Sequence, residues 1–207
     1  MSDSFVKPLL LGFIALFFVV RAYHHHQAVT RGGKIEYKER HSKAILLLRM
    51  AGGLVLLTAL GLYFTAPQWV AWADIPLPAW ARWLGLAVGY VNLPLLWWIE
   101  ATLGKNFNTT LHLREGHTLV TDGPYRWVRH PMYTSLFVFT VAVLLASANW
   151  LIGLPGLIAL TVIVVNRIDA EEALMMERFG DEYRQYMRRT GRFLPRFVKS
   201  LQPKDSL

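Results

Sequence analysis

The chain is 207 residues long, and 54% of its residues are hydrophobic while only 17% are charged. A soluble domain of this size carries about 25% charged residues, so the composition excludes an ordinary soluble protein and predicts a single membrane domain. The net charge is +8 at pH 7, which loops facing anionic lipid headgroups explain better than a nucleic-acid partner does. The absence of cysteine excludes disulfides, thiolate metal sites and a cysteine nucleophile.

Three apolar blocks in the first half of the chain are long enough to cross the hydrocarbon core of a membrane. They run from about Phe5 to Val20, Ala44 to Phe64 and Trp83 to Trp98, and a crossing helix needs about 20 apolar residues. A signal peptide is the alternative for the first block, but Arg21 and a run of histidines follow it where a cleavage site needs small residues. We therefore predict a retained first helix, and Pro94 predicts a kink in the third.

The stretch from Met132 to Val165 is almost continuously apolar and too long for one helix. The polar break Ser147-Ala148-Asn149 predicts two helices joined by a tight turn, and Pro155-Gly156 predicts a bend in the second. Each half is marginal for a full crossing, so a re-entrant hairpin is the alternative to two spans. In both cases the chain returns to the side of the membrane that it left.

Basic residues are concentrated in alternate connections between the apolar blocks, and this alternation sets the orientation. Three segments carry most of them: Arg21, Arg31, Lys34, Lys38, Arg40 and Lys43; Lys105, Arg114, Arg126 and Arg129; and Arg167, Arg178, Arg184, Arg188, Arg189, Arg192, Arg196, Lys199 and Lys204. The other connections carry only Lys7 and Arg82. The pattern predicts an integral protein of the cell inner membrane, with the N-terminus outside and the C-terminus in the cytoplasm.

The basic tail predicts an amphipathic helix, because its apolar residues recur at helical spacings. These residues are Ile168, Met175, Phe179, Tyr183, Tyr186 and Met187. Gly180-Asp181 predicts a stop and restart of this helix, and Gly191 predicts its end. The tail is therefore expected to fold on the membrane surface or back over the bundle.

The predicted fold is an all-α polytopic integral membrane protein with about five transmembrane helices. It has a C-terminal helical hairpin and a cytoplasmic amphipathic tail helix. The chain is expected to form one domain over residues 1–207, with the first three helices in 1–100, the hairpin, its preceding loop and the tail in 101–195, and the tail end in 196–207.

The segment before the hairpin is rich in polar residues that a membrane span does not require. Gly123-Pro124 predicts a turn, and Pro131 forces His130 into an extended conformation before the next helix. Arg129, His130 and Tyr133 are therefore expected at a helix N-terminus, where backbone N–H groups favour anionic ligand groups.

A second polar segment follows the hairpin. Arg167 and Glu171 are four residues apart and lie on one helical face, with Glu172 beside them. The hairpin brings this segment next to Arg129, His130 and Tyr133. Two interpretations remain open from the residues alone: a catalytic cluster, or interfacial anchors and solvated charges.

Both segments resemble the signature of the isoprenylcysteine carboxyl methyltransferase family, over about residues 104–195. The first block contains Gly116-His117-x-Leu119-Val120, Gly123-Pro124-Tyr125 and Arg129-His130-Pro131-x-Tyr133, and the second contains Glu171-Glu172, Leu174 and Phe179-Gly180-x-Glu182-Tyr183-x-x-Tyr186. As in the family, the two blocks flank an apolar hairpin. Phospholipid N-methyltransferases share a similar arrangement.

The resemblance implies S-adenosylmethionine as the cofactor and identifies the residues that would enclose it. The matching positions are His117, Leu119, Val120, Gly123, Tyr125, Arg129, His130, Tyr133, Glu171 and Glu172. The Glu pair would bind the cofactor's amino group through charge-assisted hydrogen bonds, and Arg167 would face the substrate carboxylate. The candidates for catalysis are Arg167, Glu171 and His130. Ser135 stands where the family often has glycine, which predicts a different helix contact rather than loss of activity.

The function that the resemblance implies is methyl transfer to a lipophilic substrate that enters sideways from the bilayer. The expected acceptor is the carboxylate of an isoprenylcysteine-like or other isoprenoid acid. An amine acceptor is the first alternative, with Glu171 or His130 taking its proton. An NADPH-dependent membrane reductase and a non-enzymatic scaffold are the others. Membrane lipids are the expected partners, without nucleic acid. No metal is expected, because the adjacent residues His24-His25-His26 point in different directions on a helix.

Overall fold

The computed structural model describes residues 5–31, 35–38, 43–106, 112–114 and 118–196. Its elements are α1 (Val6–Arg31), β1 (Ile35–Lys38), α2 (Lys43–Thr65), η2 (Pro67–Trp69), η3 (Ala71–Ala73), α3 (Ala79–Leu103), η4 (Gly104–Asn106), β2 (His112–Arg114), η5 (Gly123–Arg126), α4 (Pro131–Ser147) and α5 (Trp150–Arg189). The helices confirm the predicted all-α membrane fold. One addition is an antiparallel pair of strands, β1 and β2. The strands are four and three residues long, too short to give a periodicity signal.

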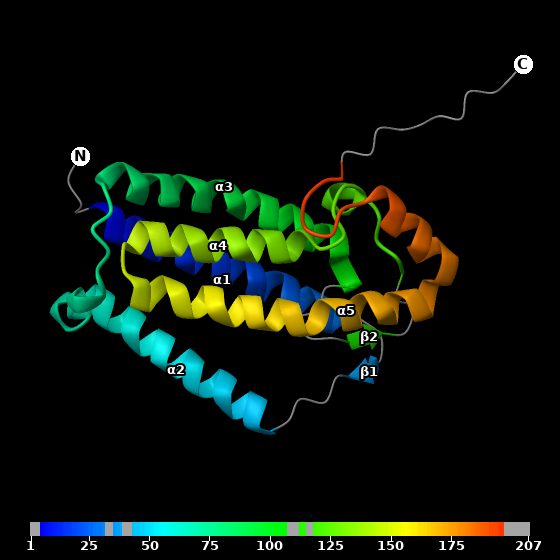
Figure 1. The fold of residues 1–207 in the computed structure, drawn as a ribbon, viewed down its shortest axis with the longest axis horizontal. Helices are drawn as coiled ribbons and strands as arrows, with labels where there is room; N and C mark the ends of the chain where they lie inside the picture. The colour runs from blue at the N-terminus through cyan, green and yellow to red at the C-terminus, as the bar shows by residue number, and fades with distance from the viewer. Residues whose placement is uncertain (1–4, 32–34, 39–42, 107–111, 115–117, 197–207) are drawn as a thin grey trace, which may run out of the picture.

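The bundle is built on α3 and α4, which pack against each other, against α1 and, through α4, against α5. Figure 1 shows α2 on the outside, where it contacts α5 near the hairpin turn and diverges from it toward the strands. Aromatic stacking fills the core: the rings of Phe17 and Phe139 lie 3.6 Å apart, and those of Phe13 and Phe139 lie 5.2 Å apart. Gly89 makes room for this stack, because a Cβ there would lie 2.8 Å from the Phe13 ring.

Three helices in the described part of the chain are long and apolar enough to cross a membrane: Val6–Thr30, Ala79–Leu103 and Trp150–Arg189. Two shorter apolar helices, Gly53–Thr65 and Pro131–Ser147, lie beside them. Large apolar side chains such as Leu57, Val91 and Val165 are exposed on the outside of these helices. An apolar outer surface of this extent fits lipid and not water, so the protein is an integral membrane protein.

The predicted break at residues 147–149 is confirmed and forms the turn of the hairpin. Ala148 adopts a left-handed conformation with a φ of 50°, and Asn149 begins α5 by accepting hydrogen bonds from Leu151 N (3.1 Å) and Ile152 N (3.3 Å). Asn149 Nδ2 also donates to Val70 O and to Asp74 Oδ1, which attaches the turn to the segment after α2. We call this the hairpin-turn end of the bundle; the N-terminus of α4 lies at the opposite end (Figure 1).

Backbone angles within α5 leave the helical region at Gly180, which has a φ of 52°. This confirms the predicted stop and restart, since glycine adopts such angles without the penalty that a Cβ brings. The helix then runs on to Arg189, close to the end predicted at Gly191. Neither Pro94 nor Pro155 interrupts its helix.

A buried polar pair joins α3 to α4 in the middle of the bundle. Ser135 Oγ donates to Asn92 Oδ1 at 2.9 Å, and Asn92 Nδ2 donates to the Ser135 carbonyl at 3.0 Å. The exposed fractions of the two residues are 1% and 3%. Ser135 stands at the position where the family often has glycine. A glycine there would have no hydroxyl to donate to Asn92 Oδ1.

We expect Ser135→Gly to destabilise the bundle by about 1 kcal/mol, because Asn92 Oδ1 would lose its donor and hydrogen bonds between membrane helices contribute about this much. The measurement is a double-mutant cycle of Ser135→Gly and Asn92→Ala, followed by unfolding of the detergent-solubilised protein. The two changes should be less than additive. Strict additivity would show that the pair contributes nothing.

Candidate active site

The polar residues predicted to act together meet at the end of the bundle opposite the hairpin turn. Here η5, the N-terminus of α4 and the second half of α5 come together with the segment that follows α5 (Figure 1). Two backbone hydrogen bonds attach the segment after α5 to the loop before α4: Arg129 N donates to Gly191 O at 2.8 Å, and His130 N donates to Arg192 O at 3.0 Å. The restart of the helix at Gly180 redirects the chain, and the backbone pairing holds its end against the loop before α4.

Gly123 sets the position of η5 against α3. Its φ is 53°, and a Cβ there would lie 2.8 Å from Thr102 Oγ1, so both the backbone angle and the available space call for glycine. The turn buries Tyr125, whose carbonyl accepts a 2.7 Å hydrogen bond from Tyr186 Oη. Burial, together with the nearby Tyr186 and the carboxylates of Glu100 and Glu171, raises the pKa of Tyr125 well above its usual value. Tyr125 is therefore neutral, and its hydrogen bond with Tyr186 joins η5 to α5.

Glu172 is surrounded by cationic or polar nitrogen atoms from three directions. Its Oε1 accepts from Arg129 Nε at 2.9 Å and lies 3.3 Å from His130 Nε2, and its Oε2 accepts from Arg192 Nη2 at 2.5 Å. Arg129 in turn donates to the carbonyls of Met187 (3.2 Å) and Thr190 (2.6 Å). The hydrogen bond to Glu172 raises the pKa of Arg192. Glu172 thus connects the loop before α4 to the end of α5.

Glu171 has more access to solvent than Glu172. Its side chain is 18% exposed, compared with 7% for Glu172. Tyr133 Oη donates to both of its oxygens, at 2.9 and 3.0 Å, and Arg167 Nη2 donates to Oε1 at 2.7 Å. The rings of His130 and Tyr133 stack with centroids 5.7 Å apart. Tyr133 and Arg167 therefore hold the Glu171 carboxylate between α4 and α5.

The structure thus brings together six of the predicted residues: Arg129, His130, Tyr133, Arg167, Glu171 and Glu172. Gly123 and Tyr125 border the group through η5. Leu119 and Val120 are half-buried in the segment that leads to η5. His117 lies outside the described residues.

Sequence reasoning missed two contributors to this end of the bundle. Arg192 reaches Glu172 only because the chain folds back after Gly180, and no spacing distinguishes it from the other tail arginines. The second is the pair of Arg21 and Glu100, whose atoms Nη1 and Oε1 lie 2.6 Å apart with Glu100 fully buried. A carboxylate beside Trp97, Trp98 and Ile99 in an apolar helix was a readable signal for this pair.

Residues 84–177 match the model of the isoprenylcysteine carboxyl methyltransferase family. Over this region the chain is similar to the isoprenylcysteine carboxyl methyltransferase family. The matched region contains most of α3, all of η5 and α4 and the first part of α5, and with them all six clustered residues. Arg21 and Arg192 lie outside it, so α1 and the returning tail bring groups to the isoprenylcysteine carboxyl methyltransferase region from elsewhere in the chain.

Individual relatives agree with this family. The human protein-S-isoprenylcysteine O-methyltransferase is 28% identical over 135 residues, which are 64% of this chain and 47% of the human protein. The Xenopus laevis protein of the same name is 31% identical over 133 residues, 62% of this chain and 45% of that protein. This chain therefore spans about half the length of these curated methyltransferases. The uncharacterized protein YpbQ of Bacillus subtilis is 26% identical over 157 residues, covering 75% of this chain and 86% of YpbQ.

A solved structure shares the fold. The eukaryotic intramembrane Ras methyltransferase ICMT superposes with a TM-score of 0.58 over 92% of this chain and 67% of that one. The sequence identity is 22%, so this comparison shows the membrane fold alone.

Proposed function

We propose that this protein transfers a methyl group from S-adenosylmethionine to the carboxylate of a lipophilic acid, of the isoprenylcysteine-like or another isoprenoid kind. The observation that carries the proposal is the placement of Arg167, Glu171 and Tyr133 at the mouth of an apolar helical hairpin. A guanidinium held there can receive a lipid carboxylate from the bilayer side. The match to the family model and the names of the human and Xenopus laevis relatives support the same reaction class.

The side chains present suit the charged groups of the cofactor. An ammonium group needs a carboxylate that a ligand can reach, and Glu171 is more exposed than Glu172. We therefore assign the cofactor ammonium to Glu171, and we assign to Glu172 the task of holding Arg129 and Arg192 in place. The stacked rings of His130 and Tyr133 supply a flat wall beside Glu171.

The residues of this chain mainly align the acceptor and exclude water. S-adenosylmethionine, when bound, would supply an electrophilic methyl group on a sulfonium, which an acceptor carboxylate could take without any proton transfer while S-adenosylhomocysteine leaves. Arg167 holds the acceptor carboxylate, with Glu171 fixing the guanidinium, and such alignment lowers a barrier by up to roughly 7–11 kcal/mol. Because one negative and one positive charge disappear together, the apolar surroundings of α4 and α5 favour the step.

The proposed site faces the cytoplasm of a cell inner membrane, with the N-terminus outside. Supporting residues are the arginines that gather at this end, among them Arg126, Arg129, Arg167 and Arg192, whereas Lys7 and Arg82 lie at the hairpin-turn end. A water-soluble cofactor and a lipid acceptor then reach the cluster from different sides.

The first test is binding of S-adenosylmethionine, S-adenosylhomocysteine and NADPH to the detergent-purified full chain by calorimetry, followed by methyl transfer to an S-prenylated N-acylcysteine. We expect the two sulfur nucleosides to compete with each other and NADPH not to bind. Binding of NADPH alone would contradict the proposal. Transfer to a lipid amine instead of the acid would correct the acceptor.

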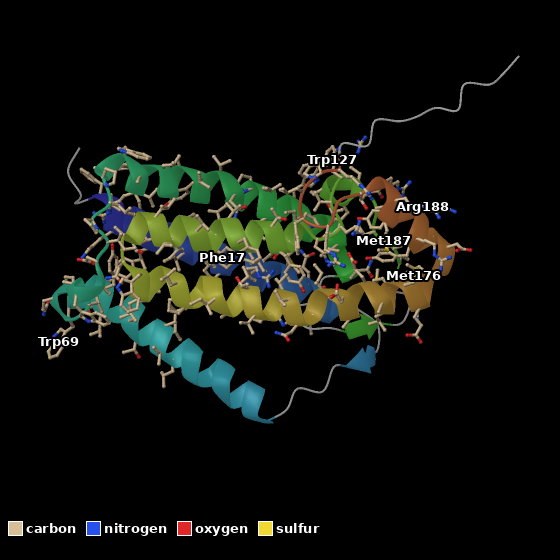
Figure 2. The ribbon with its side chains drawn as sticks, in the orientation of Figure 1. Phe17, Trp69, Trp127, Met176, Met187 and Arg188 are labelled. Atoms are coloured by element: carbon tan, nitrogen blue, oxygen red, sulfur yellow. The ribbon has the colours of Figure 1, made fainter. Side chains whose placement is uncertain are left out.

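Arg167→Gln should raise the KM for the prenylated acid about tenfold or more, since a hydrogen bond between charged groups contributes about 1.5–3 kcal/mol. The affinity for S-adenosylhomocysteine should change little. Arg188→Gln is the matched control, because Arg188 is exposed on α5 and points away from the bundle (Figure 2). Equal acceptor KM values in the two variants would remove Arg167 from the acceptor site.

A further inference from the structure

A pocket with a volume of about 420 Å³ lies at the hairpin-turn end of the bundle, far from the proposed active site. The start of α1, the end of α2, the segment between α2 and α3, the start of α3 and the hairpin turn all line it. Its charged lining residues are Lys7, Asp74 and Arg82. Five separate parts of the chain thus enclose one polar space.

The two cations of this pocket are the exceptions in the charge pattern of the sequence. Lys7 and Arg82 are the basic residues of the connections that otherwise carry none, and they are 75 positions apart in the chain. Basic residues on this side oppose the orientation that the other loops favour. Their convergence on one pocket places two cations where one anionic group could bind both.

Hydrogen bonds hold both cations at the pocket wall. Lys7 Nζ donates to Tyr63 O at 3.2 Å and lies 4.8 Å from the centre of the Tyr63 ring. Arg82 Nε donates to Ala146 O at 3.2 Å. A lysine ammonium has three donors and a guanidinium has five, so both side chains can also bind an anion.

The carboxylate in the pocket belongs to Asp74 and is held by the hairpin turn. Asp74 Oδ1 accepts from Asn149 Nδ2 at 2.8 Å, and Asp74 is exposed at the pocket rim. A pocket with two cations and one carboxylate matches a ligand that carries an anionic and a cationic group. Inorganic phosphate alone leaves the carboxylate unmatched.

The surface around the pocket is that of a membrane interface. Trp69, Trp72 and Trp80 are 69%, 67% and 68% exposed, and Trp69 projects outward at this end (Figure 2). Tryptophans gather at the depth of the lipid headgroups, where their rings meet apolar tails and their N–H groups meet water. The pocket therefore opens at the level where phosphates of the bilayer lie.

We propose that this pocket binds the headgroup of a zwitterionic phospholipid with a primary amine, with its phosphate between Lys7 and Arg82 and its ammonium at Asp74. The bound lipid would link α1, α2, α3 and the hairpin turn at the end of the bundle where α2 meets the other helices. A phosphocholine headgroup fits less well, because its quaternary ammonium has no N–H to donate to Asp74.

Native mass spectrometry of the full chain in detergent tests the proposal, with phosphatidylethanolamine, phosphatidylcholine, phosphatidylglycerol and inorganic phosphate as the probes. We expect phosphatidylethanolamine to bind most tightly. Lys7→Gln and Arg82→Gln should each weaken it about fivefold, since one basic residue near a membrane surface contributes about 1 kcal/mol. Arg188→Gln, which removes an exposed cation elsewhere, should leave it unchanged.

Asp74→Asn separates the two halves of the proposal and keeps an acceptor for Asn149. It should abolish the preference for phosphatidylethanolamine over phosphatidylcholine while the affinity for phosphatidylglycerol is kept or rises. Equal binding of all lipids in the wild type and the variants would overturn the site. Displacement of the lipid by millimolar inorganic phosphate would show a free-phosphate site and overturn the lipid assignment.

Discussion

Glu172→Gln is expected to lower the free energy of unfolding by about 3 kcal/mol. The carboxylate bonds Arg129 and Arg192 and lies beside His130, and the Arg129 side chain is only 9% exposed. Removing the negative charge leaves that guanidinium buried without its counter-ion, and breaking a buried pair costs about 3–5 kcal/mol. Glutamine keeps the shape and some hydrogen bonds, which places the expected loss at the lower limit.

Thermal unfolding of the detergent-solubilised protein, followed by tryptophan fluorescence, measures this loss. Asp181→Asn is the matched control, because Asp181 pairs with Arg184 on the surface, where ion pairs contribute little. Equal Tm values for the two variants would show that Glu172 does not hold the loop. Glu171→Gln should weaken S-adenosylhomocysteine binding and should also lower the Tm, because the Arg167 side chain is 9% exposed and would lose its counter-ion.

Gly153→Ala is expected to destabilise the protein by about 1–3 kcal/mol, the usual cost of overpacking. A Cβ at position 153 would lie 2.6 Å from Leu144 Cα, so α4 and α5 would have to separate near their turn. Backbone atoms cannot yield as a flexible side chain can. Because the hairpin carries Tyr133 on one helix and Glu171 on the other, cofactor affinity should fall together with stability.

Gly156→Ala is the control for this prediction. Gly156 lies three residues later on the same helix, and a Cβ there would meet only Thr140 Cγ2, at an ordinary 3.6 Å. Alanine also favours a helix over glycine, so this variant should be as stable as the wild type or more so. Unfolding measurements on both variants decide the matter, and equal stability would mean that the two helices do not touch closely at Gly153.

The structure differs from the sequence-based expectations in several features. The sequence placed the third apolar block at Trp83 to Trp98, but α3 runs from Ala79 to Leu103, because helix propensity and packing extend a helix beyond its most apolar residues. The two strands between helices went unpredicted because each is held by its partner and not by its own pattern. Arg192 was counted only as a tail charge, yet it bonds Glu172.

Local signals in the sequence were enough to determine the apolar helices, the break at Ser147-Ala148-Asn149, the interruption at Gly180 and the residues of the family motifs. Hydropathy, turn chemistry and helical spacing depend on residues that are close together in the chain, so the sequence alone reveals them. Tertiary structure alone decided three other features. Arginines surround Glu172, Arg21 pairs with Glu100, and Lys7 and Arg82 share a pocket. These neighbours are separated by 20 to 79 positions in the chain, and only the packing of the helices brings them together.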